Sequence, residues 1–582
     1  MLKTLGAQLK EYTKASIATP LFMLLEVLME TIIPFLMAKI IDVGIYGENQ
    51  GYVVKMGLLM VACAFVSLFG GWMGAKYGAK ASMGLGRNLR KAMFKNIQTF
   101  SFSNIDKYST AGLVTRMTTD VTNIQNAYQM ILRMAMRAPA SLICAMAMSF
   151  FISPKLASIY LVAVIILGFC LALIVFFAMR YFREAFLKYD DLNESIQENV
   201  SAIRVVKAYV RGDYEKKRFK KASQSIYNML SRAENVVLWN APLMNLTVYT
   251  CILLISWFGA HFIVAGELTT GNLTSLLTYC MSILMNLMML SMIFVMVSMS
   301  IASANRIAEV LNEKSDLTNP ENPDYEVVDG SIRFDHVTFR YNEHSEAPIL
   351  DDINLDIRSG ETVGIIGGTG SSKSSLVNLI SRLYDVNDGA VYVGGKDVRS
   401  YDLDTLRNEV SVVLQQNVLF SGSILDNLRW GNPNATEEEC IEACKMACAD
   451  EFIQKFPDKY NTHIEQGGTN VSGGQKQRLC IARALLKKPK ILILDDSTSA
   501  VDTATDANIR KAFREAIPGT TKLIIAQRIS SVMDADRIIV MNDGKLDGFD
   551  THENLLVSND IYRDVYESQT SGGGDFDEGG AN

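Results

Sequence analysis

The segment Gly367-Gly-Thr-Gly-Ser-Ser-Lys373-Ser374 has the residue types and spacing of a loop that binds phosphate groups. It follows an apolar, strand-like run at 361–366 and leads into an apolar, helix-like run at 375–384. Backbone N–H groups at a helix N-terminus attract anionic phosphates, the lysine reaches the terminal ones, and the Ser374 hydroxyl suits Mg²⁺. We therefore expect this loop to hold a nucleotide with Mg²⁺.

One residue of this loop departs from the usual pattern. Ser372 stands directly before the lysine, where such loops have glycine. If the backbone there requires a positive φ, serine costs on the order of 1 kcal/mol relative to glycine. We expect nucleotide binding to be weakened by this residue but not lost.

Two further segments carry chemistry in the same half of the chain. The buried, strand-like run 491–494 ends in the acids Asp495 and Asp496, and Val471-Ser-Gly-Gly-Gln475 stands just ahead of a basic helix at 476–488. Together with the phosphate loop, this set and spacing resembles the ATP-binding cassette (ABC) family, whose signature motif reads Leu-Ser-Gly-Gly-Gln. The resemblance covers essentially the whole chain.

This resemblance implies ATP and Mg²⁺ as cofactors and assigns roles to individual positions. Tyr341 resembles the aromatic residue that stacks on adenine, and Gln415 resembles the glutamine that senses the γ-phosphate. Asp495 resembles the acid that holds Mg²⁺ through water, and the segment 499–502, which ends in Asp502, resembles the loop that communicates between two nucleotide sites. The implied ATP-binding residues are Tyr341, Gly367, Thr369, Gly370, Ser371, Ser372, Lys373, Ser374, Ser375 and Gln415, with Ser374, Gln415 and Asp495 at the metal.

The two catalytic positions differ from the family pattern. Asp496 stands where the family has the glutamate that polarises the attacking water, and Gln527 stands where it has a histidine that contacts the γ-phosphate. A carboxylate displaced by ~1 Å costs about 10²-fold in rate, and an amide cannot become an imidazolium. We expect this site to bind ATP and to hydrolyse it slowly.

The signature segment is complete in Ser472, Gly473, Gly474 and Gln475. In the family, the signature of one subunit closes over the phosphate loop of the other. A poor catalytic half-site beside a complete signature therefore favours a heterodimer, whose partner is a homologous half-transporter with the usual Glu and His. A homodimeric lipid or peptide exporter and a non-transporting membrane nucleotide sensor are the alternatives.

The elements before residue 306 are those of a membrane domain. Lys and Arg crowd the segments 76–137 and 180–232, so the positive-inside rule places both termini in the cytoplasm of a multi-pass plasma-membrane protein, which we expect to be bacterial. The apolar runs are long enough to cross a bilayer. Six spans are predicted at 21–41, 53–75, 137–152, 156–178, 238–264 and 273–302.

The two basic segments read as long helical hairpins that reach about 40 Å beyond the bilayer. The predicted fold is thus an all-α polytopic membrane domain, with six transmembrane helices and long cytoplasmic extensions, followed by an α/β P-loop ATPase domain. The predicted boundaries are 1–312 for the transmembrane domain, 313–330 for a linker, 331–568 for the nucleotide-binding domain and 569–582 for a disordered tail.

Charged and flexible residues within the spans are candidates for a substrate cavity. Glu26 and Glu30 lie one helical turn apart in the first span, where they would attract cationic amphiphiles or hydrogen-bond to a neighbouring helix. Arg137 would line the cavity or extend to the lipid headgroups. A methionine stripe in the sixth span, Met285, Met289, Met292 and Met296, suits either varied hydrophobic or amphipathic substrates or plain helix packing.

Composition excludes other classes of function. The net charge is −6, and the acidic residues gather in the second half of the chain, which argues against nucleic acid as a partner, whereas the basic first half suits membrane lipids. The nine cysteines are spread through the chain and do not suggest a disulfide framework. Cys440, Cys444 and Cys448 fall on one face of an expected helix, which Thr436 and Glu439 would cap, so we interpret them as packing residues and not as metal ligands.

Overall fold

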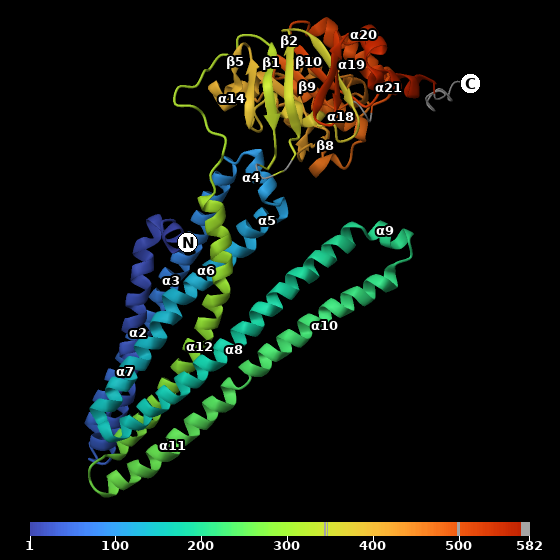
Figure 1. Ribbon diagram of the computed structural model, residues 1–582. Coiled ribbons are helices and arrows are strands. Elements are labelled where there is room, and N and C mark those ends of the chain that lie inside the picture. Colours follow the sequence, from blue (N-terminus) through green and yellow to red (C-terminus); the bar gives the residue numbers. More distant parts are fainter. Residues whose placement is uncertain (343–344, 346, 498–500, 572–582) are drawn as a thin grey trace. The chain divides into compact units, whose positions relative to one another are not determined.

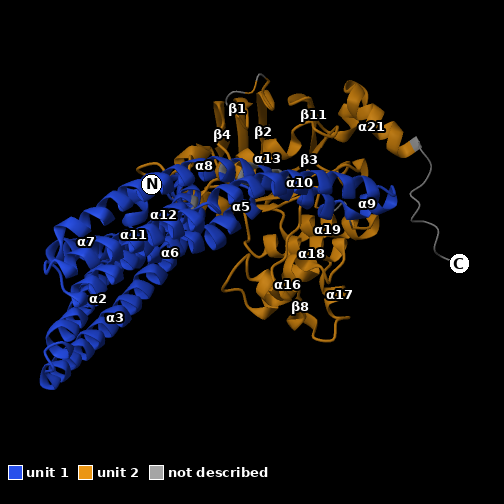
Figure 2. Cartoon of the chain, turned by 90° about the horizontal axis from the view of Figure 1, so that it is seen from below, with its two compact units in different colours: residues 1–99, 108–314 blue, residues 100–107, 315–582 orange. Residues whose placement is uncertain are grey.

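The chain forms two compact units. The structure, a computed structural model, describes residues 1–342, 345, 347–497 and 501–571. The first unit comprises Met1–Thr99 with Tyr108–Lys314, and the second comprises Phe100–Lys107 with the chain from Ser315 onwards (Figure 2). The division at Lys314 lies within the predicted linker.

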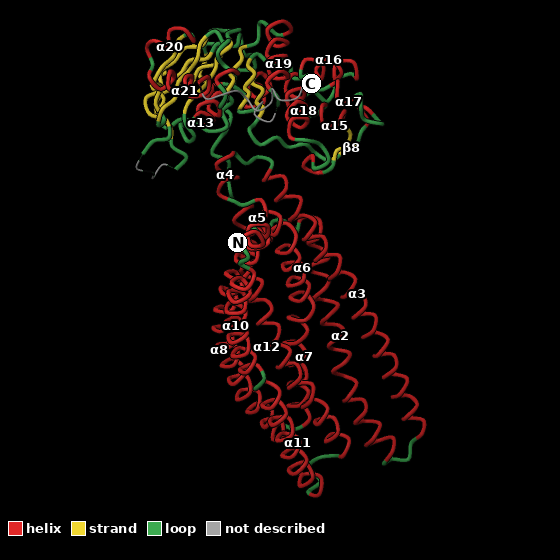
Figure 3. Tube along the Cα trace, turned by 90° about the vertical axis from the view of Figure 1, so that its right-hand side faces the viewer, coloured by secondary structure: helices red, strands yellow, loops and turns green. Residues whose placement is uncertain are grey.

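The regular elements of the first unit, over its described residues, are all helices (Figures 1 and 3). Each of the six predicted spans lies inside one of six apolar helical stretches long enough to cross a membrane, so the predicted spans are confirmed. The helices are α1 (Leu2–Gly6), α2 (Thr13–Lys39), α3 (Gln50–Ile97), α5 (Thr110–Thr115), α6 (Val121–Met130), α7 (Met136–Ile152), α8 (Pro154–Ser201), α9 (Ile203–Ala208), α10 (Gly212–Val237), α11 (Asn240–Val264) and α12 (Thr270–Asn312).

Polar side chains mark where three of the long helices begin. The side chain of Asn49 accepts a hydrogen bond from the backbone N–H of Tyr52 at the start of α3. Ser153 does the same before α8, whose first residue is Pro154, and Thr269 caps α12. These caps satisfy backbone donors that have no partner within the helix. The helices therefore start at residues whose side chains can replace a missing carbonyl.

The second long extension is a pair of helices lying side by side, α8 and α10 (Figure 1). Near its tip, Nδ2 of Asn199 donates to Glu215 over 2.9 Å, and Arg218 pairs with Glu198 at 3.0 Å. The short helix α9 joins the pair. This is the helical hairpin predicted from the basic segment 180–232.

The second unit is an α/β domain. Its main sheet has six strands in the order β12-β11-β3-β10-β9-β6, all parallel except the edge strand β12. A four-stranded sheet, β2-β1-β4-β5, and a pair, β7-β8, complete it. The strands are β1 (Ile332–Phe339), β2 (Leu350–Ile357), β3 (Thr362–Gly367), β4 (Asp388–Val393), β5 (Lys396–Asp397), β6 (Val410–Val413), β7 (Gly422–Ser423), β8 (His463–Ile464), β9 (Ile491–Asp495), β10 (Thr521–Ile525), β11 (Arg537–Asn542) and β12 (Lys545–Asp550).

The helices of the second unit connect and cover these strands. They are α4 (Phe102–Lys107), α13 (Lys373–Ile380), α14 (Leu403–Glu409), α15 (Ile424–Leu428), α16 (Glu437–Met446), α17 (Asp450–Ile453), α18 (Gly473–Leu485), α19 (Thr503–Ala516), α20 (His552–Ser558) and α21 (Asp560–Ser571). The alternation of strands and helices confirms the predicted α/β domain.

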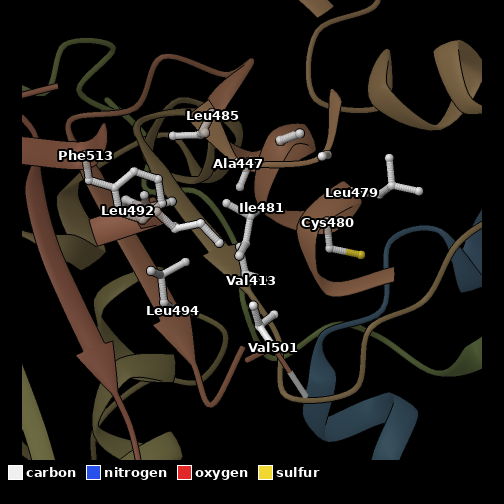
Figure 4. Packing of buried hydrophobic residues seen from close by; sticks show 14 of the residues in the cluster. Val413, Ala447, Leu479, Cys480, Ile481, Leu485, Leu492, Leu494, Val501 and Phe513 are labelled. Atoms are coloured by element: carbon white, nitrogen blue, oxygen red, sulfur yellow. The ribbon is translucent and has the colours of Figure 1, made fainter. Parts of the chain in front are cut away.

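A buried apolar cluster joins the helical and sheet parts of this unit (Figure 4). Leu479 and Ile481 of α18 are almost completely buried, as are Leu492 of β9 and Phe513 of α19. Because α18 is buried in this core on more than one side, its N-terminus has a defined position.

The three clustered cysteines differ in part from the prediction. The capping box of Thr436 and Glu439 is present, and Cys440 and Cys444 are buried on α16. Cys448 follows the end of α16 and has a φ of 51°. The left-handed turn removes it from the helix, so the three residues do not share one helix face.

The end of the second unit differs from the predicted boundary at 568. Helix α21 continues to Ser571, which places the first three residues of the expected tail in a helix. Tyr562 anchors this helix because its side chain is fully buried and its hydroxyl lies 2.6 Å from Nδ1 of His552. Residues 572–582, the remainder of the predicted tail, lie outside the described residues.

Candidate nucleotide-binding site

The phosphate loop joins a central strand of the main sheet to a helix. It begins at Gly367, the last residue of β3, and ends at Lys373, the first residue of α13. A side chain at Gly367 would meet the carbonyl oxygen of Met541 at 2.3 Å, so only glycine fits beside β11. The carboxyl edge of a parallel sheet and a helix N-terminus therefore meet here, as a phosphate site requires.

The ammonium group of Lys373 lies within the loop. Its Nζ donates to the carbonyl oxygens of Gly367 at 3.0 Å and Gly368 at 2.8 Å, and to Oγ of Ser371 at 3.2 Å. Burial lowers the pKa of Lys373, and the nearby carboxylates of Asp495 and Asp496 oppose this effect. Lys373 thus presents a positive charge at the N-terminus of α13, next to exposed Thr369 and Gly370.

Ser372 has the left-handed backbone considered from the sequence. Its φ is 70° and its ψ is 21°, and it precedes α13 without a side-chain capping bond. A left-handed conformation costs a non-glycine residue roughly 1–2 kcal/mol. The loop therefore carries local strain at the position where the pattern has glycine.

Two oxygen-bearing side chains converge beside the loop. Oγ of Ser374 donates to Oδ1 of Asp495 over 3.1 Å, at the end of β9. Burial raises the pKa of Asp495, and the bond from Ser374 opposes the rise. A hydroxyl and a carboxylate oxygen in contact are the kind of ligands that Mg²⁺ takes, so these residues fit the metal.

Asp496 and Gln527, the two positions at which the resemblance implies catalytic residues, contact each other. Nε2 of Gln527 donates to Oδ2 of Asp496 over 2.8 Å. Burial raises the pKa of Asp496, while hydrogen bonds from Gln415 and Gln527 lower it. The amides of Gln415 and Gln527 thus both bond to the carboxylate of Asp496, next to the phosphate loop.

Tyr341 packs edge-on against other aromatic rings and remains half exposed. Its ring centroid lies 4.8 Å from that of Phe339 and 5.0 Å from that of Tyr384, and its hydroxyl lies 2.9 Å from Oγ of Ser375. The bond to Ser375 ties the aromatic side chain to the helix that follows the phosphate loop. A planar base would find an exposed ring face here.

The signature residues form the first turn of α18. Oγ of Ser472 accepts a hydrogen bond from the backbone N–H of Gln475, and Oε1 of Gln475 accepts one from the backbone N–H of Ser472 at 2.9 Å. Gly473 and Gly474 lie between them at the start of the helix. This reciprocal cap holds the N-terminal amides of α18 in a fixed array that suits an anion.

Two family models match the chain, and related proteins match nearly its whole length. Residues 17–304 match the model described as ABC transporter transmembrane region, and residues 350–499 match the model described as ABC transporter. The chain is 37% identical over 561 residues to the "Uncharacterized ABC transporter ATP-binding protein YfiB" of Bacillus subtilis, covering 96% of this chain and 97% of that protein. It is 35% identical over 576 residues to MT1311 of Mycobacterium tuberculosis, covering 98% of each. This chain belongs to the ABC transporter family.

A solved structure shares the fold of this ABC transporter. It is described as "Structure of a bacterial Atm1-family ABC exporter with ATP bound" and superposes with a TM-score of 0.84 at 23% identity, covering 96% of this chain and 99% of that chain. The protein is therefore a multi-pass membrane protein with the exporter fold and a C-terminal ABC ATPase domain that powers transport. The predicted fold class is confirmed.

The segment expected to communicate between two nucleotide sites is described only in part. Residues 498–500, which include Ser499, lie outside the described residues. The side chain of Asp502 accepts a hydrogen bond from the backbone N–H of Thr505 and caps α19. This bond is the largest cause that holds the pKa of Asp502 below its usual value.

The charged residues of the first and third spans of the transporter pair with one another. Arg137 lies 3.2 Å from Oε1 of Glu26 and 2.8 Å from Oε1 of Glu30. This geometry joins α2 to α7 and corresponds to the helix-bridging interpretation of the two acids. A cavity role for Glu26, Glu30 and Arg137 stays a prediction.

The methionine stripe lies on the outer surface of this chain. Met285, Met292 and Met296 of α12 are exposed, whereas Met289 is partly buried. A cavity of about 860 Å³ opens elsewhere on α12, between it and α8. Leu171, Phe176, Leu287 and Phe294 are among the residues that line it.

Sequence reasoning missed two residues that contact the nucleotide site. Tyr384 touches the Tyr341 ring and donates from its hydroxyl to Oδ2 of Asp106 in α4 over 2.7 Å. Its place at the end of the predicted helix 375–384 was the available signal. Gln569 bonds to the loop that carries Gln527, and no sequence pattern indicates it.

Proposed function

We propose that this ABC transporter subunit exports hydrophobic or amphipathic small molecules as one half of a heterodimer, and that its own nucleotide site binds ATP but hydrolyses it slowly. The observation that carries the proposal is the hydrogen bond between Gln527 and Asp496. Both residues stand where the family resemblance implies groups that act on water and the γ-phosphate.

The chemistry of this pair explains slow hydrolysis. The carboxylate of Asp496 is one methylene shorter than that of glutamate, so a water molecule held at the family's distance would be out of its reach by ~1 Å. The amide of Gln527 is neutral and is directed at Asp496, and it cannot supply a positive charge. A general base that is misplaced and bonded to a neutral donor is a weak catalyst.

The rest of the site supports ATP binding. Lys373 and the N-terminus of α13 would hold the phosphates, Tyr341 would stack on the base, and Ser374, Asp495 and Gln415 would hold Mg²⁺. When bound, Mg²⁺ neutralises charge on the β- and γ-phosphates. Ser372 would weaken this binding without removing a ligand.

The signature turn supports a role in a second, active site. ABC exporters work as dimers. The capped turn of Ser472 and Gln475 presents backbone amides that can bind an anion. In an unequal pair these amides would complete the site of a homologous partner that has Glu and His. ATP binding would then close the pair, and hydrolysis at the partner's site would reset it.

Composition and cavity shape support an apolar cargo. The space between α8 and α12 is within the usual size of small-molecule pockets and has mainly aliphatic and aromatic walls, with Arg180 and Glu184 also among its lining residues. Such a lining suits molecules with a large apolar part and a polar end. The excess of Lys and Arg at 76–137 and 180–232 supports a cytoplasmic position for both termini in a bacterial plasma membrane.

The test compares the two nucleotide sites of the purified pair in lipid nanodiscs. Replacing the partner's catalytic glutamate by glutamine should abolish ATP turnover, whereas Asp496→Asn should change it by less than about twofold. Lys373→Ala serves as the control that removes ATP from the site of this chain. Equal losses in the two carboxylate variants would contradict the unequal pair.

Two further measurements separate the alternatives. Rapid ATP hydrolysis by this chain in isolation would favour an active homodimer. Nucleotide binding with no uphill movement of a hydrophobic compound in proteoliposomes would favour a membrane nucleotide sensor.

A further inference from the structure

The loop that carries Gln527 leaves the main sheet and finds partners in the C-terminal helix. Strand β10 ends at Ile525, and Ala526 still donates to the carbonyl oxygen of Ile365. Beyond that point, Nε2 of Gln569 donates to the carbonyl oxygen of Gln527 over 2.9 Å, and Oε1 of Gln569 accepts from the backbone N–H of Ile529 over 2.8 Å. One side-chain amide therefore satisfies two backbone groups that are two residues apart, as a neighbouring strand would.

These two hydrogen bonds fix a short stretch of backbone on both sides of Arg528. The N–H of Ile529 opens a single helical turn at Ile529–Ser531, which has no side-chain cap of its own. Gln569 supplies the missing acceptor from a different element of the fold. The Ile529 side chain is buried in the core, so the loop is held at its backbone and at its side chain.

Helix α21 is itself anchored close to Gln569. The buried Tyr562 lies seven residues earlier, and Oδ1 of Asn559 accepts from its backbone N–H. The ring of Tyr566 lies 5.4 Å from that of His552. These contacts make the last turns of α21 a fixed support.

The direction of the Gln527 side chain depends on this backbone. Its amide meets Asp496 at 2.8 Å, a distance at which a shift of 1 Å breaks the bond. We propose that Gln569 is a positioning residue, which holds the loop of Gln527 so that this side chain reaches Asp496. The C-terminal helix thereby sets the geometry beside the carboxylate, whether the site hydrolyses ATP slowly or rapidly.

The test replaces the amide of Gln569 by an apolar side chain of similar length in the full chain in nanodiscs. Gln569→Met should raise the hydrogen exchange rate at Ile529 by about tenfold, because one hydrogen bond of about 1.4 kcal/mol is lost. Exchange in the first turns of α21 should not change. Thr570→Ala is the matched control on the same helix, since its hydroxyl bonds to the preceding turn at Tyr566.

A second readout depends on the link to Asp496. In this chain without its partner, Gln569→Met should change the residual kcat for ATP in the same direction as Gln527→Leu, with the KM for ATP changed by less than about twofold. In a Gln527→Leu background, Gln569→Met should cause no further change in kcat. A helix that only stabilises the domain would not show this dependence.

The proposal is overturned if Ile529 exchanges equally fast in Gln569→Met and Thr570→Ala, or if exchange rises over the whole second unit. It is also overturned if the effects of Gln569→Met and Gln527→Leu on kcat add. Rapid ATP hydrolysis by the isolated chain would reject the slow site of the proposed function and would leave the exchange result at Ile529 unaffected.

Discussion

Gln527 and Asp496 are hydrogen-bonded to each other, with Nε2 and Oδ2 2.8 Å apart. The two residues that stand where the family resemblance implies a glutamate and a histidine are therefore in direct contact. An amide that donates to a partly buried carboxylate stabilises its charge. The amide of Gln527 therefore opposes the rise in the pKa of Asp496 that burial causes.

Replacing Gln527 by leucine should shift the pH dependence of the remaining ATP turnover. Burial raises the pKa of Asp496, and the amides of Gln415 and Gln527 lower it. Losing one donor to the carboxylate raises the pKa of Asp496 further. Because a general base works when it is ionised, activity should then decline at a higher pH on the acid side.

The measurement is the residual kcat against pH for this chain purified without its partner in nanodiscs, so that turnover at the partner's site does not mask it. Gln416→Leu, an exposed glutamine beside Gln415, is the control and should leave the profile in place. An unchanged acid limb in Gln527→Leu would show that Asp496 does not titrate under the influence of this amide.

Replacing Ser372 by glycine should tighten ATP binding. The left-handed backbone at Ser372, with φ of 70°, costs serine about 1 kcal/mol that glycine does not incur. If ATP selects this loop conformation, affinity should rise by up to about fivefold in equilibrium titration with a fluorescent ATP analogue.

Replacing Gly370 by alanine is the opposite substitution in the same loop. Its φ is 87°, and an added Cβ would meet no atom within 4 Å, so Gly370→Ala tests conformation without a clash. It should weaken ATP binding by a similar factor. Equal affinities in the two variants would contradict a role for left-handed backbone in the loop.

Removing Arg137 should destabilise the membrane domain. The Glu26 side chain is 12% exposed and lies 3.2 Å from Arg137. Arg137→Ala would leave this buried carboxylate without its cation, which costs about 3 kcal/mol in comparable sites. Thermal unfolding in nanodiscs should show a lower midpoint, and adding Glu26→Gln should recover most of the loss.

The same variants test the predicted cavity role. If Glu26 attracts cationic substrates, Glu26→Gln alone should reduce transport of a cationic compound and leave a neutral one of similar size unchanged. Equal transport of both compounds would contradict the cavity role of Glu26 and leave its role in bridging α2 and α7.

Tyr384 should influence the stimulation of ATP turnover by transported substrate more than it influences ATP binding. Its hydroxyl donates to Asp106 of α4 over 2.7 Å, while its ring contacts Tyr341. Tyr384→Phe keeps the ring and removes the hydroxyl, so the KM for ATP should be unchanged and stimulation of ATP turnover by substrate should fall severalfold. The control is Tyr325→Phe, an exposed tyrosine in the linker.

A double-mutant cycle with Asp106→Ala measures this contact. A hydrogen bond to a charged group contributes about 1.5–3 kcal/mol, so the two substitutions together should cost clearly less than the sum of their separate effects. Additive effects would show that Tyr384 and Asp106 act separately.

Features with a local signal were predictable from the sequence. The spans follow from long apolar runs, and the phosphate loop follows from glycine, lysine and serine spacing between a strand and a helix. The left-handed backbone at Ser372 could be considered beforehand because the position of glycine in the pattern indicates it. The capping box at Thr436 and Glu439 was also readable, since both partners lie within four residues.

Features that depend on distant partners were not predictable. Spacing could not show that Gln527 meets Asp496, which lies 31 residues away, or choose between a cavity and a bridge for Glu26 and Glu30. Gln569 belonged to a segment whose composition suggested disorder, yet its two bonds reach back about 40 residues. Such contacts depend on how α21 packs, and a single sequence carries no local mark of that packing.

The 48-residue length of α8 has a mechanical consequence. At 1.5 Å per residue this one helix spans ~70 Å, without a proline after its first residue. If it tilts as a stiff rod, a rotation of about 5° displaces its far end by ~6 Å relative to its pivot. A shift of less than about 1 Å near the pivot thus becomes a displacement at the far end that is wide enough for a small organic molecule to pass.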